Sequence, residues 1–104
     1  MRLKSSVKLR GMSNQILLAV VVAQEVYAEY DLTLRITSIN DGRHGIGSLH
    51  FQGNAVDLGT RSGNTQYGDT QKQALVGALA QRLGFEYDVI LESDHIHIEW
   101  QPKK

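Results

Sequence analysis

The stretch YDVILESDHIHIEW, residues 87–100, decides the fold because it holds two expected strands, Tyr87–Leu91 and His95–Trp100, joined by the short turn Glu92-Ser93-Asp94. In the second segment the apolar residues Ile96, Ile98 and Trp100 alternate with polar ones, which predicts a β-strand with one apolar face and one polar face. The polar positions are His95, His97 and Glu99. Packing alone does not explain two imidazoles and a carboxylate on one strand face, so this face predicts a functional site.

The segments before this hairpin predict two helices and two further strands. A helix is expected from Asn14 to about Tyr30, with Ser13 as its N-cap. Residues 32–37 alternate as a strand that turns Leu32, Leu34 and Ile36 toward the core, and residues 55–58 suggest a short strand.

The second helix is expected after a polar, glycine-containing loop over residues 59–69. It runs from about Gln71 to Leu83, is capped by Asp69 or Thr70, and ends at Gly84. The expected core residues of this helix are Leu75, Val76, Leu79 and Leu83.

This order of elements predicts an α+β fold, with a small, largely antiparallel sheet and helices on one of its faces. Residues 1–104 are expected to form a single domain and, in our interpretation, a monomer. Asp57, His95 and His97 then share the polar face of the sheet, on the side away from the core.

The composition is that of an ordinary globular protein, with 41% hydrophobic and 21% charged residues. A formal net charge of zero argues against a nucleic-acid-binding protein, which usually has a basic excess. The basic residues at the two ends are interpreted as solvated tails. Because the chain has no cysteine, any zinc site must use nitrogen and oxygen ligands.

The apolar run over residues 16–23 follows several basic residues and resembles a targeting segment. It is shorter than the roughly 20 residues that a membrane span needs. Its apolar stripe continues at helical spacing as far as Tyr30, which favours a buried helix over a secretory signal. We therefore expect cytoplasmic synthesis and no membrane span.

All four histidines of the chain fall in two short stretches, residues 44–50 and 95–97. His50, Asp57 and His97 make up a mixed nitrogen and oxygen donor set of the kind that binds catalytic zinc. A zinc ion with three protein ligands keeps a position for water and lowers the pKa of that water to about 7. These residues therefore predict a zinc site with hydrolytic chemistry.

The residues around the first ligands also carry a family resemblance. Residues 48–57 read Ser-x-His-x-x-Gly-x-Ala-x-Asp, and Asp94 stands three residues before His97. This pair of motifs resembles the zinc D,D-/L,D-peptidases, which include D-Ala-D-Ala carboxypeptidases and endolysins that cut L-Ala-D-Glu bonds. The resemblance is closer still to the hedgehog signalling domain, which shares that fold, through Ser48-Leu49-His50-Phe51, Ala55-Val56-Asp57, Glu92-Ser93 and His95-Ile96-His97.

The resemblance implies roles for individual residues. It makes His50, Asp57 and His97 the metal ligands and leaves two candidates for the general base. Asp94 is favoured, because the peptidases keep its spacing to the last ligand, and Glu92 is the alternative from the hedgehog branch. The auxiliary groups expected to stabilise an oxyanion or orient substrate are His95 and His44. Independently of the resemblance, Glu99 on the same strand face is expected to be a carboxylate that is either solvated or orients an imidazole.

One departure from the peptidase pattern concerns substrate binding. Many of these peptidases have an arginine after the strand that ends in Thr-Ser, and it holds the substrate carboxylate. Here Thr37-Ser38 is followed by Ile39-Asn40-Asp41, so that arginine is missing. Arg43 or Arg35 is expected to replace it, with Ser48 as a further substrate-binding candidate.

The leading expectation is a zinc peptidase that cuts peptidoglycan stem peptides next to D-amino acids and reaches the wall after lysis or through a phage holin. The alternative is a non-catalytic zinc-containing binding module of the hedgehog type, in which His44 or His95 closes the site. A metal-dependent amidase acting outside peptidoglycan is a third possibility.

Overall fold

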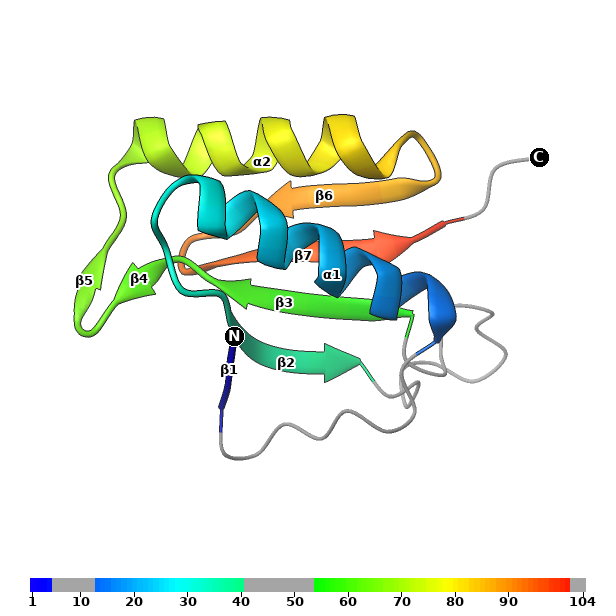
Figure 1. Cartoon of the computed structure of the whole chain (residues 1–104), viewed down its shortest axis with the longest axis horizontal. Coiled ribbons are helices and arrows are strands. Elements are labelled where there is room, and N and C mark those ends of the chain that lie inside the picture. The colour runs from blue at the N-terminus through cyan, green and yellow to red at the C-terminus, as the bar shows by residue number, and fades with distance from the viewer. Residues whose placement is uncertain (5–12, 41–53, 102–104) are drawn as a thin grey trace.

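A five-stranded sheet, in the order β1-β2-β3-β7-β6, forms the centre of the molecule (Figure 1). The computed structural model describes residues 1–4, 13–40 and 54–101. The strands of this sheet are β1 (Arg2–Leu3), β2 (Arg35–Asn40), β3 (Ala55–Gly59), β6 (Tyr87–Leu91) and β7 (His95–Trp100). Only the β1–β2 pair is parallel; the other three pairs are antiparallel. The predicted α+β class and largely antiparallel sheet are therefore confirmed.

Both helices, α1 (Asn14–Glu29) and α2 (Asp69–Leu83), pack on the same face of this sheet (Figure 1). The core joins α1 residues such as Ile16 and Val20 to the apolar face of the strands, where Val56, Ile96 and Ile98 are buried. The apolar run over residues 16–23 therefore lies in a helix with one buried face, as predicted. No helix in the described part of the chain is long and apolar enough to cross a bilayer.

The helix ends differ in how well the sequence anticipated them. The N-cap of α1 is confirmed, because the Ser13 hydroxyl accepts a hydrogen bond from the Ile16 amide at 3.1 Å. The cap predicted for α2 is wrong: the helix begins at Asp69, and Gly68 holds the N-cap position in an extended conformation. Asp69 therefore lies in the first turn, where a carboxylate is favoured by the helix dipole. The predicted end of α2 at Gly84 is confirmed.

Two strand boundaries also differ from the prediction. The strand expected over residues 32–37 is observed at Arg35–Asn40 instead. A bulge between Ile36 and Ser38 shifts the pairing with β3, so that Ile39 lies opposite Val56 and the strand continues to Asn40. A bulge adds one residue and changes which later positions face the core. The loop expected over residues 59–69 contains a small hairpin of β4 (Arg61–Ser62) and β5 (Thr65–Gln66).

Tyr27 on α1 ties the helical layer to the end of β3. Its ring is fully buried, and its hydroxyl donates a hydrogen bond to the Gly59 carbonyl at 2.8 Å. Burial raises the pKa of the Tyr27 hydroxyl, so this group remains a protonated donor at ordinary pH.

Replacing Tyr27 by phenylalanine is expected to lower the free energy of unfolding by about 1–3 kcal/mol, because a buried carbonyl loses its donor. Tyr30→Phe is the matched control, since Tyr30 is 37% exposed at the end of the same helix. Urea denaturation of the three proteins measures the effect. Equal losses in the two variants would show that the Gly59 contact contributes nothing specific.

Candidate functional site

The polar face of the sheet brings together residues from β3 and β7. In the antiparallel pairing Asp57 lies directly opposite His97, while their neighbours Val56 and Ile98 turn into the core. The expectation that Asp57, His95 and His97 share the face opposite the core is therefore confirmed. The sequence pattern produces this separation because Asp57 stands between Val56 and Leu58 in β3, and His97 stands between Ile96 and Ile98 in β7.

His97 lies between two carboxylates. Its Nδ1 is 2.8 Å from Oδ1 of Asp57, and its Nε2 is 3.1 Å from Oε1 of Glu99. The other oxygen of Glu99 accepts a hydrogen bond from the side-chain amide of Gln101. The side chains of His97 and Asp57 are 24% and 23% exposed, so this pair can be reached from solvent. The expectation that Glu99 contacts an imidazole is confirmed.

These contacts change the protonation of His97. The hydrogen bond to Asp57, assisted by that to Glu99 and opposed by burial, raises the pKa of His97 from 6.5 to about 9. In the absence of metal the ring is therefore an imidazolium at neutral pH. A metal that binds at Nδ1 must displace this proton, so metal affinity falls as the solution becomes more acidic.

The titration of His97 gives a testable pH dependence for the zinc-free protein. Its folded pKa of about 9 lies above the ordinary value of 6.5, so its stabilising contribution is complete below pH 6.5 and is lost as the pH rises through 9. That contribution amounts to at most about 3 kcal/mol. NMR of the imidazole carbon-bound protons measures the pKa, and Glu99→Gln should lower it. A midpoint below pH 7 in the unaltered protein would contradict the assignment.

His95 forms a second carboxylate–imidazole contact on the same face. Its Nδ1 is 2.8 Å from Oδ1 of Asp94, and its Nε2 is 3.8 Å from Oδ1 of Asp57. The hydrogen bond to His95 is the main cause of a lowered pKa at the exposed Asp94. A carboxylate that binds Nδ1–H leaves the lone pair of Nε2 available and fixes the orientation of the ring.

The hairpin between β6 and β7 places Glu92 differently from the expectation based on strand parity. Simple alternation along one strand turns both Glu92 and Asp94 away from the face of His97. The observed register pairs Ile90 with His97, and the Glu92 amide donates to the His95 carbonyl at 2.8 Å. Even-numbered positions of β6 therefore share a face with odd-numbered positions of β7. The backbone of Glu92, just past the end of β6 at Leu91, therefore lies opposite His95, and continuing the same register assigns Glu92 to the polar face.

Four predicted site residues lie outside the described residues: the ligand His50, the auxiliary His44, and the substrate-binding candidates Arg43 and Ser48. Within residues 1–4, 13–40 and 54–101 no three His, Asp or Glu side chains are grouped so as to hold a metal ion. Asp57 and His97 nevertheless fit as two of three zinc ligands. Oδ1 of Asp57 and Nδ1 of His97 face each other, so one oxygen and one nitrogen are available to a metal. Glu99 forms a hydrogen bond with the other ring nitrogen of His97, and a carboxylate in that position is usual for metal-binding histidines.

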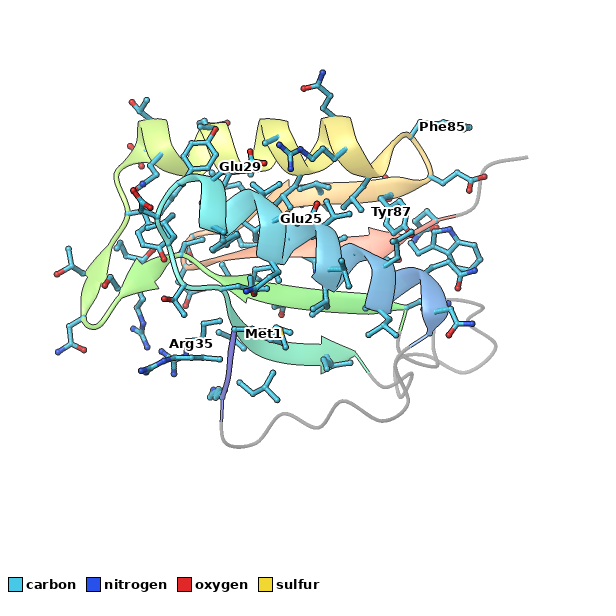
Figure 2. All side chains as sticks on the ribbon, viewed as in Figure 1. Met1, Glu25, Glu29, Arg35, Phe85 and Tyr87 are labelled. Atoms are coloured by element: carbon cyan, nitrogen blue, oxygen red, sulfur yellow. The ribbon has the colours of Figure 1, made fainter. Side chains whose placement is uncertain are left out.

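Arg35, the third substrate-binding candidate, lies at the start of β2 beside β1 (Figure 2). It lines a pocket with Lys4, Arg61 and His95. Sequence reasoning missed Arg61 and interpreted Arg2 and Lys4 as part of a solvated tail. Residues 2–4 are exposed to solvent, as that interpretation requires, but they are not a loose tail, because β1 pairs with β2 and the Lys4 amide donates to the Ile36 carbonyl at 3.0 Å. A two-residue strand is too short to produce a recognisable alternation.

A comparison with known families gives a match over most of the chain. The family model of the hedgehog amino-terminal signalling domain matches residues 6–99, which include both the strand of Asp57 and the strand of His97. No solved structure matches the chain.

Proposed function

We propose that this chain, which belongs to the family of the hedgehog amino-terminal signalling domain, is a zinc peptidase acting on peptidoglycan stem peptides. Zinc would be held by His50, Asp57 and His97. The bonds cut would be amides next to D-amino acids. The observation that carries the proposal is the 2.8 Å contact between Asp57 and His97, oriented by Glu99 on a solvent-accessible face.

The described donors suit zinc chemically. Zinc prefers imidazole nitrogen and carboxylate oxygen when thiolates are absent, and catalytic sites keep one coordination position open. When bound, it supplies a Lewis acid that makes water nucleophilic at neutral pH. The remaining steps depend on side chains of the chain itself.

The contacts of Asp94 and Glu92 suggest different tasks. Asp94 is engaged with His95, and its lowered pKa makes it a weaker base than an ordinary aspartate. Glu92 lies opposite His95 on the polar face. We therefore favour Glu92, the alternative from the sequence, as the base that takes a proton from water and passes it to the leaving amine. Asp94 would act as a positioning residue that orients His95.

His95 would face the reacting carbonyl. Its Nε2 lies 3.8 Å from the proposed ligand Asp57, so its polar edge borders the place where substrate would meet the metal. As an imidazolium, the ring would keep its Nδ1–H on Asp94 and also donate from Nε2 to the oxygen that becomes negative during attack on the amide.

Product analysis tests this function. The purified chain, with zinc content measured by mass spectrometry, is incubated with defined muropeptides, and the products are identified by mass. Release of a D-amino acid or cleavage beside one is the expected result. A chelator-treated sample and Asp57→Asn are the controls, and both should give no product. Persistent cleavage in both controls would overturn a zinc mechanism.

A non-catalytic binding module is the second candidate function, and one distance favours it. His95 Nε2 and Asp57 Oδ1, 3.8 Å apart, are close enough to bind one ion together, which would close the site with a fourth ligand. His95→Ala separates the two functions. Loss of turnover with zinc retained supports the peptidase, whereas loss of zinc, together with no cleavage by the unaltered chain, supports the module.

A further inference from the structure

A lysine occupies the core-facing side of α2, where the other residues are apolar. Lys72 is 8% exposed and stands three residues before the buried Leu75, on the stripe that continues to Leu79. A lysine is rarely buried to this extent unless its ammonium has a partner, because desolvating the charge is costly. The ammonium of Lys72 therefore needs a polar group inside the fold.

That group belongs to the connection between β6 and β7. Nζ of Lys72 donates a hydrogen bond to the Ser93 carbonyl at 3.4 Å. In the part of the chain that the structure describes, Lys72 forms no ion pair, so no carboxylate takes the place of this carbonyl. α2 lies over β6 and begins at the end of the sheet where β6 ends (Figure 1). The ammonium thus reaches from the helical layer to the connection that carries Glu92 and Asp94.

The backbone of this connection does little to hold itself in place. β6 and β7 pair as far as Leu91 and Ile96, and continuing that register leaves a two-residue loop, Ser93-Asp94. Two-residue hairpin loops normally use turn types with positive φ, because those turns match the twist of the strands. Neither loop residue has a positive φ, and the two form a bend rather than a hydrogen-bonded turn. Contacts from outside the loop therefore decide how the two strand ends are held.

The position of the two candidate carboxylates depends on this connection. Glu92 precedes the loop, and its amide donates to the His95 carbonyl at 2.8 Å. Asp94 is the second loop residue, and its Oδ1 is 2.8 Å from Nδ1 of His95. A change in the twist of the loop would move both carboxylates relative to the metal site. A displacement of about 1 Å can cost roughly 100-fold in rate.

We propose that Lys72 is a positioning residue whose ammonium holds the Ser93 carbonyl from the helical side of the sheet. The β6–β7 connection, and with it Glu92 and Asp94, is thereby fixed for reaction. This inference rests on the proposed peptidase function and adds to it a residue that lies outside the polar face. The charge of the side chain is required as well as its length, because an apolar end would leave the carbonyl without its donor.

The test exchanges the ammonium for a neutral group of the same shape. The chain has no cysteine, so Lys72→Cys introduces a single thiol. Alkylating this thiol with bromoethylamine in the unfolded chain restores an ammonium after refolding, whereas iodopropane gives a side chain of the same length that ends in a methyl group. With zinc bound to both products, we expect kcat of the neutral form to be about 10–100-fold lower than that of the cationic form, with a similar KM. Circular dichroism verifies that both have refolded.

Hydrogen exchange measured by NMR tests the contact without any catalysis. In Lys72→Met the amide of Glu92 should exchange at least about tenfold faster, because its bond to the His95 carbonyl opens more often once the charge-assisted contact is lost. The amide of Ile98, in the buried middle of β7, should exchange at an unaltered rate. Gln73→Met is the matched control, since it places the same residue on the exposed side of α2 and should change neither exchange nor turnover.

The outcomes separate positioning from simple stabilisation. Equal kcat in the cationic and neutral forms would overturn the proposal, and so would unchanged exchange of the Glu92 amide in Lys72→Met. Faster exchange at Glu92 and Ile98 alike would show that Lys72 only stabilises the fold, which also contradicts the proposal. Faster exchange at Glu92 alone, in a chain that cleaves no muropeptide, would support the role of Lys72 in holding the connection and contradict the peptidase function.

Discussion

Asp57→Asn is expected to lower the affinity for zinc by more than about 100-fold, beyond the range produced by loss of a residue that only supports a ligand. Asparagine keeps the size of the side chain but removes the charge that a zinc ligand supplies. Asp57 lies opposite His97, with its Oδ1 2.8 Å from the ring nitrogen that the metal would share. Zinc competition titrations with a fluorescent chelator measure the affinity of the purified variant.

Asp88→Asn is the matched control for this experiment. Asp88 pairs with Glu99 on the same two strands but is not a proposed ligand, so its variant should retain zinc. Both variants need to keep the far-ultraviolet circular dichroism of the unaltered chain. If Asp57→Asn bound zinc as tightly as Asp88→Asn, the ligand set of His50, Asp57 and His97 would be wrong.

Glu92→Gln is expected to lower kcat by about 10²–10⁴-fold, the usual contribution of a general base, while zinc stays bound. Glutamine keeps the shape of the side chain and cannot accept a proton. The reason to choose Glu92 is its position opposite His95 in the hairpin, on the face that carries His97. Single-turnover assays on a defined stem peptide, with zinc content measured on the same sample, check the result.

Asp94→Asn distinguishes a base from a positioning residue. If Asp94 only orients His95, the loss should be about 10–100-fold, and the NMR signals of the His95 ring should move because its partner at Nδ1 is altered. A loss in Asp94→Asn that exceeds the loss in Glu92→Gln would assign the base to Asp94, as the spacing of the sequence motif favours. Loss of zinc in either variant would instead add that carboxylate to the ligand set.

The elements that the sequence predicted best are those whose pattern is local. The strands at residues 87–91 and 95–100 were expected with the bounds observed, because the β-branched and apolar run of the first and the alternation of the second each lie within six residues. The first helix was predicted within one residue, since Ser13 provides a local cap. The predicted polar face followed from the same alternation.

The elements predicted poorly depend on partners far along the chain. β1 has two residues and exists because β2 offers it hydrogen bonds. The bulge in β2 is defined only by the pairing with β3, and it moves Ile39 opposite the buried Val56. The side of the sheet on which Glu92 lies follows from the register of the β6–β7 hairpin, which alternation within one strand does not specify.

The sequence by itself determined that this chain is an α+β domain with histidines and carboxylates on one face of its last strand, because side-chain alternation is a property of the local chain. It also contained the motifs of the family. Only the tertiary structure decided which of these groups meet: Asp57 with His97, Asp94 with His95, and Arg35 with Lys4 and Arg61. The physical reason is that these contacts cross between strands, whose order and register are determined by the packed core and the turns.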